Sequence, residues 1–162
     1  PLLQSSAASD VYKRQADSQS NGRGQYGRKW ISFKGNLFVS IFYNLENIDL
    51  TITKITKLNC ILVKKLISKY YKKKIVYKKP NDLLIKGKKI CGILQEIINK
   101  QNQKFLILGI GINLIKNPII TNYPTTNLND LINKKISKRN IEIQLKKIFE
   151  KNLEIYKHKK NK

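Results

Sequence analysis

The sequence predicts an α+β layer fold, and three observations favour it. Short apolar segments rich in β-branched and aromatic residues recur between residues 36 and 108, close enough together to form hairpins. Two longer segments carry apolar residues at steps of three and four, the spacing of amphipathic helices. The 162 residues, 41% of them hydrophobic, are enough for one domain with a core. Strands grouped as hairpins beside helices are typical of α+β domains.

The first predicted elements are a loop, a strand and a helix. Residues 16–29 are polar and rich in glycine, which indicates a loop. Residues 36–45 form an apolar run with aromatic and β-branched side chains, which predicts a buried strand. The helix that follows is predicted from one apolar stripe with lysines on the other face: Ile52, Ile55, Leu58, Ile61, Leu62, Leu66 and Ile67.

A second group of strands is predicted at residues 75–77, 83–85, 90–98 and 105–108. The turn Pro80-Asn81-Asp82 separates the first two of these strands, and the glycine of Lys86-Gly87-Lys88 suits a hairpin between the next two. The last strand leads into Gly109-Ile110-Gly111-Ile112-Asn113.

The last part of the chain is predicted to hold a loop and two helices. Residues 117–127 are rich in Pro, Thr and Asn, which indicates the loop. Asn129 or Asp130 is the expected cap of a short helix. A final amphipathic helix is predicted from Ile141, Leu145, Ile148, Phe149, Leu153 and Tyr156.

We divide the chain into three parts. Residues 1–15 are expected to be a non-native leader outside the folded core, because their composition differs from that of the rest. Residues 16–157 are expected to form one domain whose natural beginning lies upstream, and residues 158–162 a charged tail.

The net charge of +23 raises the alternative of a nucleic-acid-binding protein. Only four of the 33 basic residues are arginine, the residue that binds phosphate and guanine bidentately. Ile and Asn are also abundant, and their codons, like those of Lys, are rich in A and T. We therefore favour compositional drift in an AT-rich genome over a specific nucleic-acid partner.

The two cysteines and the apolar runs bear on the cellular location. Cys60 and Cys91 fit neither a metal-binding spacing nor a disulfide framework, so we expect both to be reduced core residues. No apolar run approaches the ~20 residues of a membrane helix, and the chain shows no signal peptide. The prediction is a cytoplasmic protein with no membrane partner.

Residues 22–30, GRGQYGRKW, have the composition of a loop that closes on an anion. Glycines let backbone amides approach a ligand, and Arg23, Arg28 and Lys29 add cationic donors. Trp30 offers a flat face for a ring. The alternatives are a Gly/Arg-rich RNA-binding loop or an ordinary surface loop, and the segment alone does not decide among them.

Three further segments carry polar groups at turns or beside glycines. Asn81 suits a nucleobase edge and Asp82 a metal or cation, although an ordinary turn is the alternative. Lys89 is expected to project from a strand start, with Gly92 allowing close approach of a ligand; the alternative is a solvated hairpin end. Residues 109–113 lack the third glycine of a dinucleotide fingerprint, so a glycine-containing strand or bulge is their alternative.

In their order and spacing, these segments together resemble biotin protein ligases. Gln19, the loop 22–30, the turn 80–82, the hairpin 87–96 and residues 109–113 follow the order of that family. The run Tyr123-Pro124-Thr125-Thr126-Asn127-Leu128 is similar to the family's P-x-A-T-S-L segment. The resemblance covers residues 16 to about 157.

The resemblance implies a mixed β-sheet flanked by helices, related to the class II aminoacyl-tRNA synthetases. It implies an enzyme that makes biotinyl-5′-adenylate from biotin, ATP and Mg²⁺, and then transfers the biotinyl group to a lysine of a biotin carboxyl carrier protein, a subunit of acetyl-CoA carboxylase. Both steps need a site that excludes water and stabilises charge on phosphate and acyl oxygens. A homodimer is possible, and no specific nucleic acid is expected as a partner.

The resemblance also implies roles for single positions. Lys89 is implied to contact the biotin carboxyl and the phosphate, and Lys89 and Arg23 are the predicted catalytic residues. The implied biotin-binding positions are Gln19, Gly22, Arg23, Gly24, Gln25, Lys89 and Gly92. The implied positions for ATP or the adenylate are Arg28, Lys29, Trp30, Lys78, Asn81, Asp82 and Asn113. Asp82 is also the predicted Mg²⁺ ligand.

The chain departs from the family pattern at several places. Gln25 stands where many members have arginine, and Lys79 replaces the usual tryptophan, which removes a packing surface. The Ser/Thr-Asn segment that holds the biotin ureido ring is expected before Ala16 and is not found there. We recognise neither a helix-turn-helix nor a C-terminal β-barrel. A short catalytic protein and a fragment of a longer one both stay open.

Two other functions also stay open. Lipoate ligases share the fold and the adenylation chemistry, although the GRG…GRxW loop and the GKKxxGIL hairpin favour biotin. A basic RNA-binding module would account for the charge and the Gly/Arg loop, but not for the remaining motifs in their order.

Overall fold

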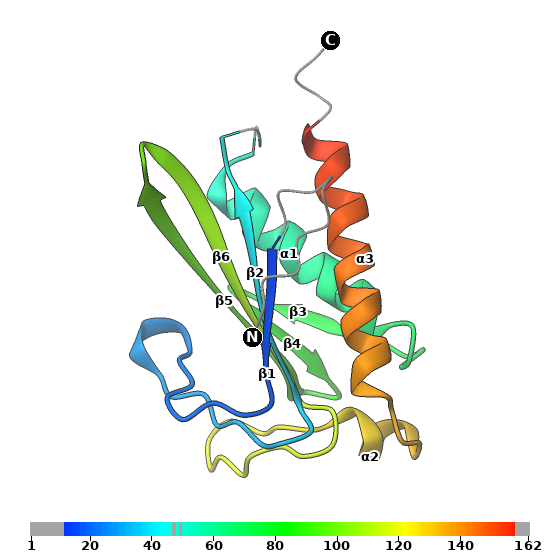
Figure 1. The fold of residues 1–162 in the computed structure, drawn as a ribbon. Helices are drawn as coiled ribbons and strands as arrows, with labels where there is room; N and C mark the ends of the chain where they lie inside the picture. The colour runs from blue at the N-terminus through cyan, green and yellow to red at the C-terminus, as the bar shows by residue number, and fades with distance from the viewer. Residues whose placement is uncertain (1–11, 47, 49, 158–162) are drawn as a thin grey trace.

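The computed structural model describes residues 12–46, 48 and 50–157, which form one six-stranded sheet with two long helices packed on it (Figure 1). The strands lie in the order β1-β2-β6-β5-β4-β3. Their bounds are β1 Tyr12–Ala16, β2 Leu37–Asn44, β3 Val76–Lys78, β4 Asp82–Ile85, β5 Lys88–Lys100 and β6 Gln103–Ile112. The helices are α1 Ile52–Ile67, α2 Leu128–Ile132 and α3 Lys138–Lys157, and a 3-10 turn, η1, spans Gln25–Gly27. The predicted α+β fold is confirmed.

All neighbouring strands in the described part of the chain pair antiparallel, whereas the family resemblance implies a mixed sheet. Strands β3 to β6 follow one another through short turns, which only antiparallel neighbours can use. Parallel pairing among the same residues is limited to one isolated bridge between Lys89 and Thr125.

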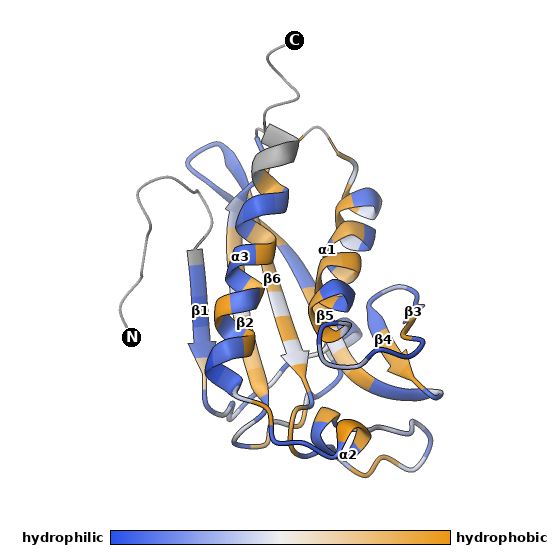
Figure 2. Ribbon diagram, turned by 90° about the vertical axis from the view of Figure 1, so that its right-hand side faces the viewer, coloured by the Kyte–Doolittle hydropathy of each residue, from blue (hydrophilic) through white to orange (hydrophobic). Residues whose placement is uncertain are grey.

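Side-chain alternation gives the sheet two different faces. On β6, Leu106, Leu108, Ile110 and Ile112 are buried, whereas the residues between them are half-buried. The buried set faces α1 and α3, whose apolar stripes complete a single core (Figure 2). We call the face turned away from these two helices the open face.

Two helix caps show why the helices begin where they do. The side chain of Thr51 accepts a hydrogen bond from the Lys54 amide at the start of α1. The cap of α2 is Asn127, whose side chain accepts from the Asp130 amide, and not Asn129 or Asp130 as predicted. Since Asn127 also ends the Pro/Thr/Asn-rich loop, composition alone did not distinguish the cap from the loop.

Strands β5 and β6 are longer than predicted. The turn at Gln101 and Asn102, with φ of 50° and 61°, is so tight that the polar residues on both sides still pair, up to Lys100 with Gln103. At the other end, residues 109–112 belong to β6, so the alternative of a glycine-containing strand is confirmed. The predicted hairpin turn at Lys86 and Gly87 is also confirmed, with φ of 50° and 75°.

The structure differs from the expected domain boundary at residues 12–15. These residues, which we assigned to a leader, form β1 with Ala16 and pair with β2 from Tyr12–Phe42 to Ala16–Phe38. Strand pairing at a sheet edge uses backbone groups, so an unusual composition does not prevent it. The side chains of Lys13, Arg14 and Gln15 are not buried. Residues 1–11 and the predicted tail 158–162 lie outside the described residues, and the division into leader and domain stays a prediction.

Cys60 and Cys91 are both buried free thiols, as predicted. Burial raises the pKa of the Cys60 thiol to about 11, which keeps it protonated at neutral pH. Among the helices in the described ranges, none has the length and apolar character needed to cross a membrane.

Candidate functional site

A cavity of about 820 Å³ lies on the open face, over the central strands β2, β6 and β5. Residues from the segment before β2 and from the loop after β6 form its sides. Every residue predicted for the site except Gly22 lines this cavity: Gln19, Arg23, Gly24, Gln25, Arg28, Lys29, Trp30, Lys78, Asn81, Asp82, Lys89, Gly92 and Asn113. The fold therefore brings together segments that are up to about ninety residues apart in the chain.

The indole of Trp30 lies on a floor made by Gly92 and Gly111, which are register partners on β5 and β6. A Cβ added to either glycine would lie 2.6 Å from the Trp30 ring, closer than carbon atoms can approach. Close approach of a ligand was predicted at Gly92; in the structure the group that approaches Gly92 is Trp30, and the approach of a ligand stays a prediction. The indole N–H is buried, and it has no hydrogen-bond acceptor among the described residues.

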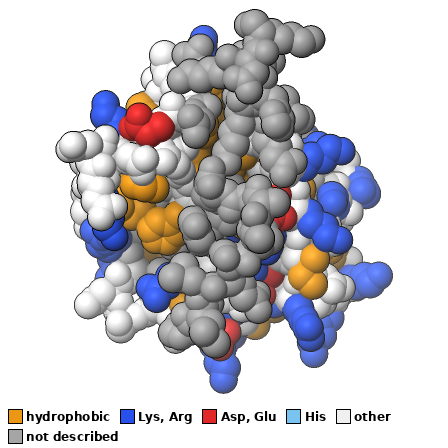
Figure 3. All heavy atoms as spheres, turned by 45° about the horizontal axis from the view of Figure 1, so that its top comes forward, with side chains coloured by type: hydrophobic (Ala, Val, Ile, Leu, Met, Phe, Trp, Pro, Cys, Tyr) orange, Lys and Arg blue, Asp and Glu red, His pale blue; other side chains and the backbone are white. Residues whose placement is uncertain are grey.

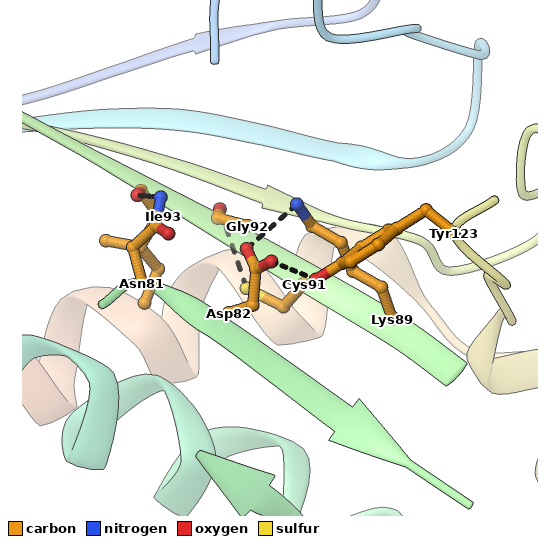
Figure 4. Close-up of polar contacts among 7 residues, drawn as sticks. All are labelled: Asn81, Asp82, Lys89, Cys91, Gly92, Ile93 and Tyr123. Carbon is orange, nitrogen blue, oxygen red and sulfur yellow. Dashed lines mark hydrogen bonds and ion pairs between the residues drawn. The ribbon is translucent and has the colours of Figure 1, made fainter. Parts of the chain in front are cut away.

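Lys89 is held at the cavity floor by Asp82, Tyr123 and Trp30, of which Figure 4 shows Asp82 and Tyr123. Its Nζ lies 2.8 Å from Oδ1 of Asp82, and the two side chains are only 19% and 13% exposed. The Tyr123 hydroxyl donates a hydrogen bond to the other carboxylate oxygen, Oδ2. The Lys89 Nζ also lies 5.3 Å from the ring centroids of both Trp30 and Tyr123, within cation–π range. The alternative of a solvated hairpin end does not hold for Lys89.

Burial, the hydrogen bond to Asp82 and the negative charge of Asp82, in that order, raise the pKa of Tyr123. The hydroxyl therefore stays protonated and remains a donor across the neutral range. Lys78 adds a second cation at the same ring, with its Nζ 4.6 Å from the Tyr123 centroid.

The loop of residues 22–30 is closed by its own backbone. Trp30 donates to the Gly22 carbonyl at 2.8 Å, and Gly24 donates to the Arg28 carbonyl at 2.6 Å. A Cβ on Gly22 would lie 2.5 Å from the Trp30 carbonyl oxygen, so this turn requires glycine. Gly22 thus shapes the loop and does not line the cavity.

Besides the packing of Trp30, an ion pair links the loop to the sheet. Nη2 of Arg23 lies 3.2 Å from Oε2 of Glu96 on β5, and the Arg23 side chain is 71% exposed. Arg28 and Lys29 are exposed on the cavity rim, and Gln25 is half-buried there. Gln19 accepts a hydrogen bond of 2.9 Å from the Ser32 hydroxyl. The rim is consequently positive and suits an anionic ligand.

Asn81 and Asn113, predicted near an adenine, already bond to the protein with their side chains. Asn81 Nδ2 donates to the Ile93 carbonyl at 2.7 Å and holds β4 to β5. Asn113 Nδ2 donates to the Thr126 carbonyl at 3.1 Å and holds the loop after β6 in place. Their contact with a nucleobase stays a prediction.

Sequence reasoning missed three residues of the site and its support: Tyr123, Glu96 and Asn36. Oδ1 of the fully buried Asn36 accepts from the amides of Leu114, Ile115 and Lys116 at 3.0, 3.0 and 3.2 Å. This fixes the start of the loop that carries Tyr123. For Tyr123, the sequence feature that could have indicated a role in the site was a lone tyrosine in a Pro/Thr/Asn-rich loop. For Glu96 and Asn36, no local pattern indicated a role, because their partners lie far away in sequence.

The predicted Mg²⁺ ligand Asp82 engages Lys89 with one oxygen and Tyr123 with the other. Within the described ranges, no group of three or more His, Cys, Asp or Glu residues could hold a metal ion. The residues present therefore do not fit a magnesium site built by the protein alone. Asp82 as a metal ligand stays a prediction.

The family comparison matches residues 5–113 to the biotin/lipoate A/B protein ligase family. The bifunctional ligase/repressor BirA of Escherichia coli (strain K12) is 35% identical over 101 residues, which are 61% of this chain and 32% of that protein. The protein of the same name from Bacillus subtilis (strain 168) is 32% identical over 150 residues, 87% of this chain and 45% of that protein. The chain thus spans from about a third to a little under half of the length of these relatives.

Two solved structures are similar over most of the chain. The biotin protein ligase from Aquifex aeolicus in complex with biotin and ATP superimposes with a TM-score of 0.78 at 28% identity, over 91% of this chain and 62% of that one. The biotin protein ligase from Leishmania major in complex with biotinyl-5-AMP has a TM-score of 0.73 at 23% identity, over 86% and 63% of the two chains. At that lower identity the likeness concerns the fold alone.

Proposed function

The chain belongs to the biotin/lipoate A/B protein ligase family, and from this we propose that it activates biotin with ATP as biotinyl-5′-adenylate and transfers the biotinyl group to a lysine of a biotin carboxyl carrier protein. The observation that carries the proposal is the convergence of the motif residues on one cavity, with the Lys89 ammonium largely buried at its floor. The similar Aquifex aeolicus structure is a complex with biotin and ATP.

In the first step, a biotin carboxylate oxygen attacks the α-phosphorus of ATP, and pyrophosphate leaves. Negative charge then grows on the phosphate oxygens, and an ammonium group withdrawn from water stabilises it more than a solvated one would. Lys89 is the cation in this position. Its pairing with Asp82 avoids the cost of a buried unpaired charge.

In the second step, the amine of the carrier lysine attacks the acyl carbon of the adenylate, and AMP leaves. The adenylate must be kept from water until then. The positively charged loop of residues 22–30 is suited to this role because it lies at the side of the cavity and carries Arg23 toward it.

The nucleotide is best placed against Trp30. Its flat ring offers stacking for a base. Mg²⁺ bound with ATP would neutralise part of the phosphate charge. As partner we propose the carrier protein, and as location the cytoplasm.

A lipoate-type ligase is the second candidate, because the matched family covers both classes of ligase. The structure of P. falciparum LipL1 in complex with lipoate has a TM-score of 0.53 at 19% identity, a likeness of fold alone. The loop at residues 22–30 and the hairpin at residues 87–96 favour biotin. If biotin is the substrate, pyrophosphate release will depend on biotin, and lipoate will not replace it.

The proposal is tested by exchanging Lys89 for a neutral side chain. Lys89→Gln removes one charge contact to the transition state, typically worth ~3 kcal/mol, so biotin-dependent pyrophosphate release should fall about a hundredfold. Lys86→Gln is the matched control, because Lys86 is an exposed lysine of the same hairpin. It should leave the rate nearly unchanged.

Both variants must first be shown to melt near the temperature of the parent protein. Equal and small effects of the two substitutions would remove Lys89 from the proposed role. Absence of biotin-dependent pyrophosphate release in the parent chain would count against the function itself.

A further inference from the structure

The cluster at the cavity floor contains one group that the proposed function does not yet use, the Tyr123 side chain. Tyr123 belongs to the loop after β6, far in sequence from Asp82 and Lys89, yet it contacts both. Its hydroxyl donates to one oxygen of Asp82, and its ring lies beside the Lys89 side chain (Figure 4). The ring of Trp30 is at the same distance from the Lys89 ammonium as the ring of Tyr123.

The backbone joins this loop to Lys89 as well. The Lys89 amide donates to the Pro124 carbonyl at 2.8 Å, and the Thr126 amide donates to the Lys89 carbonyl at 2.9 Å. The backbone amide and carbonyl of Lys89 therefore both form hydrogen bonds with residues that follow Tyr123. The position of the Tyr123 side chain is consequently set relative to Lys89 itself.

Asp82 has to hold Lys89 in one place although a carboxylate can rotate about its Cβ–Cγ bond. A second, directional hydrogen bond to the other oxygen opposes this rotation. Since both side chains of the ion pair are mostly buried, each bond is stronger than it would be in water. Tyr123 supplies that second bond.

Resting on the proposed function, we propose that Tyr123 is a positioning residue of this site. Its hydroxyl fixes the Asp82 carboxylate, and the carboxylate holds the Lys89 ammonium between the rings of Trp30 and Tyr123, where the reacting carboxyl and phosphate groups meet it. Tyr123 acts through Asp82 and takes no part in bond making.

The test begins with Tyr123→Phe, which keeps the ring and removes only the hydroxyl. One hydrogen bond to a charged group is lost, so kcat for biotin-dependent pyrophosphate release should fall about tenfold, whereas KM for biotin and for ATP should change less than about twofold. Tyr70→Phe is the matched control. Tyr70 is also half-buried, and its hydroxyl accepts a bond of 2.9 Å from Gln144, on α3.

A double-mutant cycle with Asp82→Asn shows whether Tyr123 acts through Asp82. If it does, adding Tyr123→Phe to Asp82→Asn will cause no further loss of kcat. Effects that multiply would overturn the proposal, as would a kcat for Tyr123→Phe within twofold of the parent. A purely structural tyrosine would lower the melting temperature and leave the cycle additive.

A second measurement does not require turnover. In ¹³C-tyrosine-labelled protein, the Tyr123 signal is assigned by its loss in Tyr123→Phe and titrated with alkali. After burial, Asp82 is the main cause that raises the pKa of Tyr123, and the charge of Arg28 lowers it. Lys78 and Lys89 also face the Tyr123 ring. Asp82→Asn should therefore lower the pKa of Tyr123. An unchanged pKa would refute the contact, whereas a lowered pKa in a chain that releases no pyrophosphate would uphold the contact and reject the proposed function.

Discussion

At Gly92 and Gly111, the absence of a single carbon atom determines where Trp30 lies. Both glycines have ordinary backbone angles, so the reason for glycine there is space and not conformation. The indole fills the space that two side chains would otherwise take. The same indole is the proposed stacking surface for the nucleotide base. By leaving space for the indole, the two glycines therefore help to form the proposed nucleotide site.

Gly111→Ala should displace Trp30 and weaken ATP binding, because the added Cβ would lie 2.6 Å from the indole. Trp30 is the one tryptophan of the chain, so intrinsic fluorescence reports on it alone. We expect a red-shifted emission, because the displaced ring enters water. Gly109→Ala is the control on the same strand and face, where the nearest heavy atom would lie at 3.7 Å. An emission maximum that stays the same in both variants would contradict this placement of Trp30.

The predicted site residues that meet in the cavity come from short local motifs. Lys89, Gly92 and Trp30 belong to short patterns in which spacing and residue type together indicate a ligand site, and they meet in the cavity. Tyr123 was missed because its role comes from the pairing of its loop with Lys89, a contact that no local pattern encodes. Asn113 was predicted from a local motif to contact the adenine, but its side-chain amide donates to the Thr126 carbonyl. Its contact with a nucleobase stays a prediction.

Among the elements, the loop of residues 22–30 is packed on the sheet at Trp30, whereas its Arg23 part is held more weakly. The described contact of Arg23 with β5 is the ion pair with Glu96, and exposed pairs of this kind contribute about 0–1 kcal/mol to stability. The loop is therefore free to exchange Glu96 for a ligand phosphate at little cost. Such an exchange is what a loop that closes on an adenylate requires.

Arg23→Ala should accordingly speed the escape of biotinyl-adenylate about tenfold, through loss of one charged hydrogen bond. Trapping of the released adenylate by a free amine measures the rate. The melting temperature without ligand should stay within about 2 °C, because little stability is lost. Arg139→Ala, an exposed arginine of α3, makes the same change of charge and should have neither effect. Unchanged escape, or a large drop in melting temperature, would count against this role of Arg23.

Five of the six strands in the described part of the chain were predicted, and β5 and β6 are longer than predicted. The alternation on β6 follows from its side chains, but its extent depends on the tight turn at Gln101 and Asn102, which lacks glycine. β1 was assigned to a leader because its composition is unusual, whereas an edge strand needs only backbone pairing and one neighbour. The ends of such strands depend on pairing with the partner strand, so the residues of the strand alone do not predict them.

For the whole molecule, the net charge of +23 is the feature that most favours a different function. In Figure 3, Lys and Arg side chains lie at several separate places on the visible face, with fewer acidic ones among them. The cavity, by contrast, gathers its charged residues around one buried lysine.

The two functions separate in a thermal-shift experiment at two salt concentrations. Biotin with ATP at about a hundred times the dissociation constant should add ~2.7 kcal/mol, which for a domain of this size raises the melting temperature by roughly 5–10 °C. Binding inside a cavity is screened little, so most of this shift should survive about 0.5 M salt. Any shift caused by an RNA oligomer should vanish there, because it rests on counterion release from phosphates. Lys89→Gln should abolish most of the shift with biotin and ATP and leave the RNA effect unchanged, since it removes only one of 33 basic residues. A salt-resistant shift with RNA, or none with biotin and ATP, would favour the nucleic-acid function over the ligase.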